Sequence, residues 1–327
     1  MMTSRAKRFA VAGLLGITLC SSGAGIAQTG YPNKPIRLIV GFPPGVLSDV
    51  TARLISSGMG SLGQPIVVEN RPGAATLIGV RAVVDAAPDG YTLGYISSAI
   101  AQARVLSTSW NVDPESQLVP ISQTVEFPLA FAVNPKKHSA TTLAEFLKAV
   151  KANPGGFNYA AVASTSGDAL VLKLLNHAAG VDVTVINYKG GAAGMQAVLA
   201  GEADAFMVSP QTARAQVAQN TLRLLAVTGE SRFRTLPQVP TLRELGYPGI
   251  TLRNWFGFMA PPGTSRNVVQ TVHGAILAAL RNPQVTTPLY EAGTDIVGNS
   301  PEEFGRAISA EIATYRKMVS DGLVKPE

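Results

Sequence analysis

The sequence predicts an α/β protein with mostly parallel sheets in two lobes. Short β-branched segments, bounded by Gly, Pro or Asn, alternate with longer segments of helical periodicity, which is typical of βαβ units. The chain of 327 residues is long enough for two domains of ordinary size. The predicted strands cover residues 36–40, 65–69, 92–97, 157–162, 183–188, 204–208 and 222–228.

The first predicted strand and the helix after it enclose a loop that we expect to bind an anion. In an open α/β sheet, this crossing places backbone N–H groups at a helix start, beside the carboxyl end of a strand. An alternative is that Gly45 only permits the turn and that Ser48 or Asp49 only caps the helix. The candidate binding residues in this loop are Phe42, Pro44, Gly45, Val46, Leu47, Ser48 and Asp49.

Three helix starts carry a capping box, in which Ser or Thr is followed three residues later by Glu. They begin at Thr142, Thr241 and Ser300, and the last has Pro301 at the first helical position. Apolar stripes of helical spacing follow Thr142 and Ser300. We therefore predict a helix that ends before Asn153-Pro154-Gly155 and another near the end of the chain.

Other loops rich in Gly and small residues are further candidates for carboxylate binding, because a carboxylate that leaves water must regain its hydrogen bonds. Helix N-termini supply N–H donors and a favourable dipole. Residues 164–168 are equally well explained as a plain helix cap. The candidates are Ala75, Thr76, Leu77, Ser98, Ser164, Thr165, Ser166, Asp168, Tyr188, Gly190, Gly191 and Asp204.

The first 27 residues resemble a secretory signal peptide. Arg5, Lys7 and Arg8 precede an apolar run of about a dozen residues, and Gly25-Ile26-Ala27 gives the small-x-small end. A lipoprotein signal ending at Cys20 is the alternative, although Leu19 is larger than the residue expected before such a cysteine. The apolar run is shorter than the roughly 20 residues that cross a bilayer. We expect an exported chain that lies in the periplasm.

Composition argues against several classes of protein. Without the signal peptide the chain has no cysteine, and its net charge of +6 falls by three, which is too little to favour nucleic acid. His138, His177 and His273 stand alone, without metal-ligand spacing. No G-x-S-x-G motif is present, and the Gly-rich segment 189–194 lacks the G-x-G-x-x-G spacing of a dinucleotide site. We expect no catalytic residue, metal or cofactor, and turnover of a bound acid would contradict this expectation.

Motifs spread over the whole chain resemble those of the Bug (TctC-like) extracytoplasmic solute receptors, the binding components of tripartite tricarboxylate transporters. They occur in the order of that family and end with the helix that starts at Ser300. The motifs are Tyr31-Pro32-x-Lys34-Pro35-Ile36, Phe42-Pro43-Pro44-Gly45 with Asp49, Val68-Glu69-Asn70-Arg71-Pro72-Gly73, Pro88-Asp89-Gly90-Tyr91-Thr92-Leu93, Tyr188-Lys189-Gly190-Gly191 and Trp255-Phe256-Gly257 with Ala260-Pro261.

The resemblance implies a periplasmic-binding-protein fold of type II, with two α/β lobes around a ligand cleft. Lobe 1 would comprise residues 28–125 and 254–327, lobe 2 residues 126–253, and strands at 129–133 and 255–259 would cross between them. It also implies that the first loop and the 164–168 loop hold the carboxylate of a small organic acid, partly through water. The partners would be this ligand and membrane subunits of the transporter, and the receptor would be a monomer. A membrane sensor that recognises the loaded receptor is the alternative partner.

The sequence departs from the family pattern where the ligand would bind. Val46 replaces a glycine, Leu47 stands where a small residue is common, and Leu77 replaces an asparagine. We therefore predict a ligand with an apolar or aromatic body rather than a citrate-like polyacid, which Phe42 would cover as the lobes close. Asp168 leaves open a ligand that carries an amino group. Trp255 and Phe256 are expected to pack at the hinge.

Overall fold

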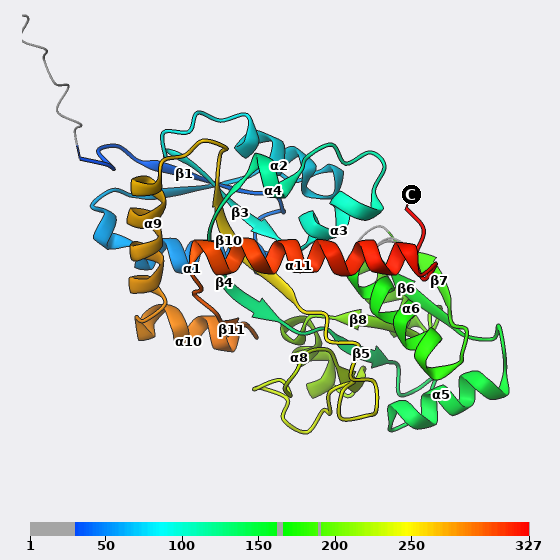
Figure 1. Cartoon of the computed structure of the whole chain (residues 1–327). Coiled ribbons are helices and arrows are strands. Elements are labelled where there is room, and N and C mark those ends of the chain that lie inside the picture. Colours follow the sequence, from blue (N-terminus) through cyan, green and yellow to red (C-terminus); the bar gives the residue numbers. More distant parts are fainter. Residues whose placement is uncertain (1–29, 162–165, 189–190, 327) are drawn as a thin grey trace, which may run out of the picture. The chain divides into compact units, whose positions relative to one another are not determined.

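The computed structural model describes residues 30–161, 166–188 and 191–326 of the chain. A short N-terminal unit, Met1–Tyr31, separates from one compact unit, Pro32–Glu327. The described residues of the compact unit form a six-stranded sheet in the order β11-β4-β10-β3-β1-β2 and a five-stranded sheet in the order β7-β6-β8-β5-β9 (Figure 1). The two sheets bear out the predicted α/β class.

The strands have the following bounds. Those of the first sheet are β1 (Ile36–Val40), β2 (Ile66–Asn70), β3 (Thr92–Ser97), β4 (Val119–Phe127), β10 (Asn254–Ala260) and β11 (Asp295–Ile296). Those of the second sheet are β5 (Ala130–Val133), β6 (Asn158–Ala161), β7 (Thr184–Asn187), β8 (Ala205–Val208) and β9 (Arg223–Val227).

The helices fall between these strands. Around the first sheet they are α1 (Leu47–Gly58), η1 (Gly60–Leu62), η2 (Ala74–Thr76), α2 (Leu77–Val84), α3 (Ala99–Leu106), α4 (Pro114–Gln117), α9 (Arg266–Ala279), α10 (Pro283–Glu291) and α11 (Pro301–Ser320). Around the second sheet they are α5 (Leu143–Ala152), α6 (Gly167–Ala179), α7 (Gly191–Ala200) and α8 (Pro210–Ala218).

The sheets are mixed, and the expectation of mostly parallel sheets was wrong, because only part of each sheet is parallel. β1 pairs in parallel with β2 and β3, and β6 with β7 and β8. β10 runs antiparallel to β3 and β4, and β5 runs antiparallel to β8 and β9. The strands that follow a passage from one sheet to the other, β5 after β4 and β10 after β9, are antiparallel to their neighbours, and the short β11 is antiparallel to β4.

The longest strand, β4, was not predicted, because polar residues interrupt its apolar pattern. Ser122 and Thr124 are fully buried, and their hydroxyl groups donate to the carbonyl oxygens of Asn299 (2.8 Å) and Phe256 (3.1 Å). Partners far away in the sequence therefore satisfy these side chains, and local periodicity cannot reveal them. The expected lobe boundary after Val125 falls inside this strand.

Local capping chemistry forms at all three predicted positions, but only two of them begin helices. The Ser300 and Glu303 side chains form a reciprocal capping box at the start of α11, and the Thr142 hydroxyl accepts from the Glu145 N–H at the start of α5. Thr241 and Glu244 also bond reciprocally, yet only turns follow, so this helix prediction was wrong. The Leu242 N–H bonds to the Val227 carbonyl instead, which ties the segment to β9.

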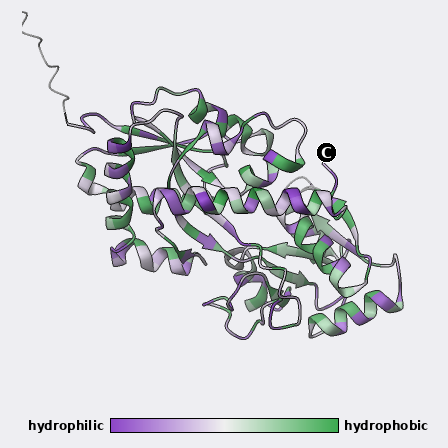
Figure 2. Cartoon of the chain, viewed as in Figure 1, coloured by the Kyte–Doolittle hydropathy of each residue, from purple (hydrophilic) through white to green (hydrophobic). Residues whose placement is uncertain are grey.

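Apolar clusters hold the sheets and their helices together, and two of them span several elements. One fills the second sheet from β5 and α5 to β9, and the other joins the apolar stripe of α11 to Trp255 and the α3 region. Figure 2 shows apolar strands and the alternating polar and apolar faces of α11. Leu170 of α6 belongs to the second cluster, so this helix of the second sheet packs onto the core of the first.

Candidate functional site

The carboxyl ends of β1, β2 and β3 meet at one edge of the first sheet, and the candidate loops follow from this edge. Val40 at the end of β1 aligns with Asn70 in β2 and with Tyr95 in β3. The loops that leave these strands contain residues 41–46, 71–76 and 98. We call this region the loop edge.

The β1–α1 loop is held rigidly by Asp49. The Gly45 N–H donates to the Asp49 carboxylate at 2.9 Å, and the Asn70 amide donates to the same carboxylate at 2.9 Å and to the Phe42 carbonyl at 3.0 Å. Burial alone would raise the pKa of Asp49, but hydrogen bonds from Arg53, Gly45 and Asn70, together with the Arg53 charge, lower it. Asp49 therefore stays ionised and fixes the loop.

The first turn of α1 receives no side-chain cap. Val46 is the N-cap residue and carries no side-chain oxygen. The N-cap residue therefore supplies no side-chain acceptor for the N–H donors at the start of this helix. Of the loop residues, only Gly45 adopts a positive φ, +82°, whereas Val46 is extended.

The β2–α2 loop is strained and lies directly against the first loop. Ala74, Ala75 and Thr76 all have positive φ values, 46°, 50° and 78°. A Cβ atom on Gly41 would lie 3.0 Å from the Thr76 Cβ. Such strain costs of order 1–3 kcal/mol for each residue and persists where the surroundings enforce it, often at ligand sites.

Three buried hydroxyl groups at or beside the loop edge have no hydrogen-bond partner within the described residues. They belong to Ser48 of α1, Thr76 before α2 and Ser97 at the end of β3, and the three residues are 2%, 7% and 6% exposed. A buried polar group without a partner costs about 1–3 kcal/mol. Within the part of the chain that the structure describes, these hydroxyls are therefore left without a hydrogen-bond partner.

Aromatic rings line the same region of the sheet. The Phe42 ring meets the Phe256 ring edge-on at 6.2 Å, and Phe256 also contacts Tyr95 (5.6 Å) and Phe127 (5.3 Å). Trp255 points to the other face of β10, where it packs on Phe304. Phe42 is half-buried and is the aromatic side chain nearest to the uncapped helix start in sequence.

The start of α6 lies beside the first sheet. A Cβ atom on Gly167 would lie 3.5 Å from the Gln102 side-chain oxygen and 3.8 Å from that of Asn254. Asn254 in turn accepts from the Ser98 hydroxyl at 3.2 Å. Ser98, Gln102, Asn254 and the first turn of α6 therefore lie together. Gln102 and Asn254 were missed by sequence reasoning, because no spacing connects them to the loops.

Asp168 in the first turn of α6 has an unusual environment. Its carboxyl accepts from the fully buried Tyr159 hydroxyl at 3.3 Å. Burial raises the pKa of Asp168, although hydrogen bonds from Ser166 and from backbone N–H groups act in the opposite direction. Its neighbours Ser164 and Thr165, and Gly190 of the later loop, lie outside the described residues.

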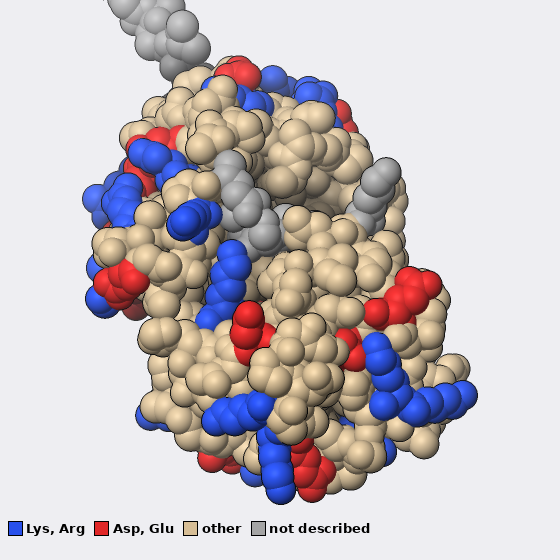
Figure 3. Space-filling model, turned by 90° about the vertical axis from the view of Figure 1, so that its right-hand side faces the viewer, with Lys and Arg blue, Asp and Glu red and all other residues tan. Residues whose placement is uncertain are grey.

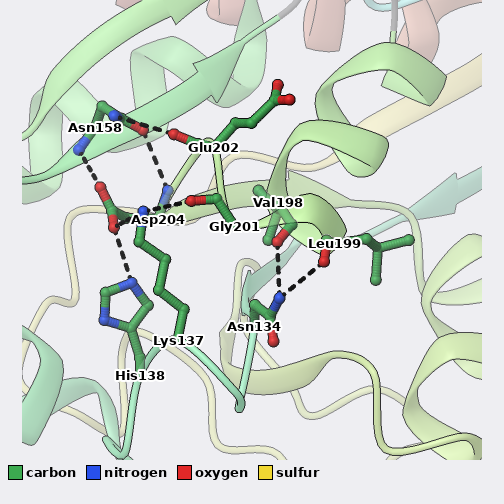
Figure 4. A network of polar contacts seen from close by, with 9 residues as sticks. All are labelled: Asn134, Lys137, His138, Asn158, Val198, Leu199, Gly201, Glu202 and Asp204. Atoms are coloured by element: carbon green, nitrogen blue, oxygen red, sulfur yellow. Dashed lines mark hydrogen bonds and ion pairs between the residues drawn. The ribbon is translucent and has the colours of Figure 1, made fainter.

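The structure corrects one candidate residue. Asp204 precedes β8, so it lies at the amino ends of β6 and β8, at the opposite edge from the loop that follows β6. There its carboxylate accepts from the Asn158 N–H (2.7 Å), Lys137 (2.7 Å) and His138 (2.9 Å), as Figure 4 shows. Asp204 therefore joins loops of the second sheet, and His138 is one of its hydrogen-bond partners.

The remaining candidates have less distinctive surroundings. Pro44 and Ala75 are exposed, and Leu47 and Leu77 are partly buried at the starts of α1 and α2. Tyr188 follows β7, where its N–H donates to the Ala161 carbonyl at 2.7 Å, and Gly191 is the exposed first residue of α7. Ser166 is the N-cap residue of α6.

The described surface and helices are consistent with these observations. On the face in Figure 3, charged side chains of both signs are interspersed. No helix within the described ranges is long and apolar enough to span a bilayer. Nor do three or more His, Cys, Asp or Glu side chains of the described residues gather as a metal site.

Two mixed sheets with helix starts gathered beside the crossing strands define the fold of a periplasmic binding protein. The model of the tripartite tricarboxylate transporter family receptors matches residues 51–322, so this chain belongs to that family. The family comprises solute-binding receptors and is not a class of enzymes.

Relatives and solved structures agree with this assignment. The chain is 33% identical to protein BugT of Bordetella pertussis over 313 residues, which cover 94% of this chain and 96% of BugT. It is similar to Rhodopseudomonas palustris MatC with bound malate (TM-score 0.77, 27% identity, 88% and 100% of the two chains). It is also similar to R. palustris Rpa4515 with adipate (TM-score 0.82, 27% identity, 91% and 100%).

Proposed function

We propose that this chain is a periplasmic receptor that captures a small organic acid and delivers it to the membrane subunits of a tripartite tricarboxylate transporter. Relatives with malate and with adipate support a carboxylate ligand. The apolar N-terminal stretch supports export, with cleavage after Ala27. The receptor acts as a monomer and releases its ligand chemically unchanged.

One observation carries this proposal: buried hydroxyl groups that have no partner among the described residues lie close to a helix start whose N-cap side chain forms no cap. Ser48 is in the first turn of α1, and Thr76 lies against the loop before that helix. A carboxylate accepts several hydrogen bonds at once, so one such group can bond to both hydroxyls and to the N–H groups of α1. The helix dipole adds about 0.3–1 kcal/mol in favour of negative charge.

The ligand binds in a cleft between two lobes, one built on each sheet. The boundaries are those expected from the sequence, with residues 28–125 and 254–327 in lobe 1 and residues 126–253 in lobe 2. Asp168 and Ser166 then face the ligand from the start of α6, on the opposite side from α1. Because burial raises the pKa of Asp168, its carboxyl is more easily protonated than usual and can then donate a hydrogen bond to the ligand.

The body of the ligand is apolar or aromatic. Val46 is 41% exposed beside the uncapped helix start, and Phe42 is half-buried in the same loop. Neither side chain can donate a hydrogen bond, so a carboxylate placed directly beside them, as in a citrate-like polyacid, would lose water without replacement. An aromatic acid of the benzoate or terephthalate type therefore fits better than citrate.

The proposal is tested first by a thermal-shift screen of mono-, di- and tricarboxylates, amino acids and aromatic acids. A ligand at a hundred times its Kd adds about 2.7 kcal/mol of stability. We expect carboxylic acids with an aromatic or apolar body to give the largest shifts, and incubation with the purified protein to leave them unaltered. Tighter binding of citrate than of benzoate-like acids would contradict the apolar ligand, and turnover would contradict a receptor.

Two variants then test the binding residues by calorimetry. Ser48→Ala and Thr76→Val remove the buried hydroxyls, and each should weaken carboxylate binding by about tenfold, the equivalent of one hydrogen bond to a charged group. Ser57→Ala is the matched control, because Ser57 is an exposed serine on the same helix. If all three variants bound the acid equally well, the carboxylate would lie elsewhere.

A further inference from the structure

A second cavity, away from the loop edge, lies between α6, the segment 249–253 and α11. Its volume is about 180 Å³, and its apolar wall is formed by Leu174, Leu252 and Met318. Adjacent residues of a strand point to opposite faces of the sheet. Trp255 bonds to Glu311 of this cavity, whereas Phe256 contacts Phe42. The cavity and the Phe42 loop therefore belong to opposite faces of β10.

Glu311 provides the acidic group of this cavity. Its two carboxyl oxygens accept from the Trp255 indole N–H (2.8 Å) and from the Tyr315 hydroxyl (2.9 Å). A carboxylate oxygen can accept a second hydrogen bond, so acceptor capacity remains. Burial raises the pKa of Glu311 to about 7, although the hydrogen bonds from Trp255 and Tyr315 act in the opposite direction.

Arg253 lines the same cavity but does not neutralise Glu311. Its two terminal nitrogens bond to Glu126 (3.0 Å) and Asp295 (2.5 Å), so two carboxylates already balance its single charge. Its Nε is buried and has no hydrogen-bond partner among the described residues. Arg253, its two carboxylate partners and Glu311 together carry a net negative charge. The Arg253 Nε–H is left without an acceptor among the described residues.

The chemistry of the guest follows from these groups. An ammonium group would donate to Glu311 and supply the missing positive charge, and an oxygen atom would accept from the Arg253 Nε–H. The volume corresponds to about six water molecules at about 30 Å³ each, which suits an organic molecule of about six to eight non-hydrogen atoms. Its carbon chain would lie against Leu174 and Met318.

We propose that the cavity between α6 and α11 is a second ligand site, which binds a small amino alcohol or a similar ammonium compound with an oxygen acceptor. The guest touches α6 on one side and α11 on the other. It therefore links a helix of the second sheet to the C-terminal helix beside the first. This site is independent of the ligand that the loop edge binds.

Calorimetry with three matched probes tests the proposal on the full mature chain. We expect 5-amino-1-pentanol to bind saturably, and 1,5-pentanediol, which lacks the ammonium group, to bind at least about tenfold more weakly. Pentylammonium, which lacks the oxygen, should lie between them. No saturable binding of the amino alcohol up to tens of millimolar, or equal binding of the diol, would overturn the proposal.

Two variants locate the site. Glu311→Gln should weaken binding of 5-amino-1-pentanol by at least about tenfold, because it removes the charge. Thr314→Met should block the cavity from its rim, since Thr314 lines it and is exposed on α11, where methionine is a good helix former. Glu302→Gln, an exposed change on the same helix, should leave binding unaltered. Unchanged binding in Thr314→Met would overturn the proposal even if Glu311→Gln failed to fold.

Discussion

Replacement of Glu311 by glutamine should change how the stability of the protein depends on pH. In the folded chain, burial holds the pKa of Glu311 at about 7, compared with 4.5 for an ordinary glutamate. Between these pH values the folded chain keeps a proton that the unfolded chain has lost. The free energy of unfolding therefore falls as pH rises from about 4.5 to about 7 and is constant above this range.

The size of the effect follows from the two pKa values. A difference of about 2.5 between them corresponds to about 3.4 kcal/mol, the full loss above pH 7, of which about 2.5 kcal/mol falls between pH 5 and pH 8. Glutamine resembles the neutral acid, because its oxygen can accept from Trp255 while its N–H₂ donates to the Tyr315 hydroxyl. The variant should therefore lack this loss.

Urea unfolding at pH 5 and pH 8 measures the difference. The free energy of unfolding of Glu311→Gln relative to the wild type should rise by about 2.5 kcal/mol between these two pH values. Other titrating groups contribute equally to the stability of both proteins, so their contributions cancel in the difference. Glu302→Gln serves as the control, because Glu302 is exposed on the same helix and should give no such change. If Glu311→Gln and the wild type lost stability in parallel, Glu311 would not titrate near neutral pH.

Three further predictions concern the loop edge. Asp49→Asn should lower the free energy of unfolding by about 1–3 kcal/mol at pH 7 in urea titrations, because the ion pair with Arg53 is lost. The lowered pKa of Asp49 means that this difference shrinks as the wild type is brought below its folded pKa. Gly79→Ala should destabilise the protein by about 1–3 kcal/mol in the same assay, since the new Cβ would lie 2.8 Å from the Gly41 Cα. Phe42→Ala should weaken binding of an aromatic acid by about tenfold in calorimetry and that of a short aliphatic acid less; an equal loss for both would argue against ring contact.

Regular elements were predictable wherever local chemistry determines them. The predicted strand at 36–40 coincides with β1, and α5 and α11 begin directly after Thr142 and Ser300 because their side chains satisfy the first backbone N–H groups. At Thr241 the same chemistry forms without a helix, because the following backbone bonds to β9. Local signals therefore predict a helix start only where no distant strand competes for the same N–H groups.

Residues of the candidate site were predictable only where their position before or after a strand determines at which edge of the sheet they lie. Ser48 and Thr76 follow strands and lie at or beside the loop edge, whereas Asp204 precedes its strand and lies at the opposite edge. The direction of a strand determines at which edge of the sheet its flanking residues lie. The position of Asp204 before β8 therefore already indicates the edge opposite to the loop that follows β6. Asn254 could not have been found, because its partner Ser98 is 156 residues away in the sequence.

Val46, which stands where the family pattern has a glycine, changes the side chains of the first loop more than its backbone conformation. Loss of a glycine would matter for geometry only if that position needed a positive φ. Gly45 takes the positive φ, whereas Val46 has φ −82° and ψ 168°, which suit a β-branched residue. The helix start thus remains uncapped and open to an anion while an exposed isopropyl group stands beside it. If this loop binds the carboxylate as proposed, selectivity for the body of the ligand can change here without disturbing the proposed hydrogen bonds to the carboxylate.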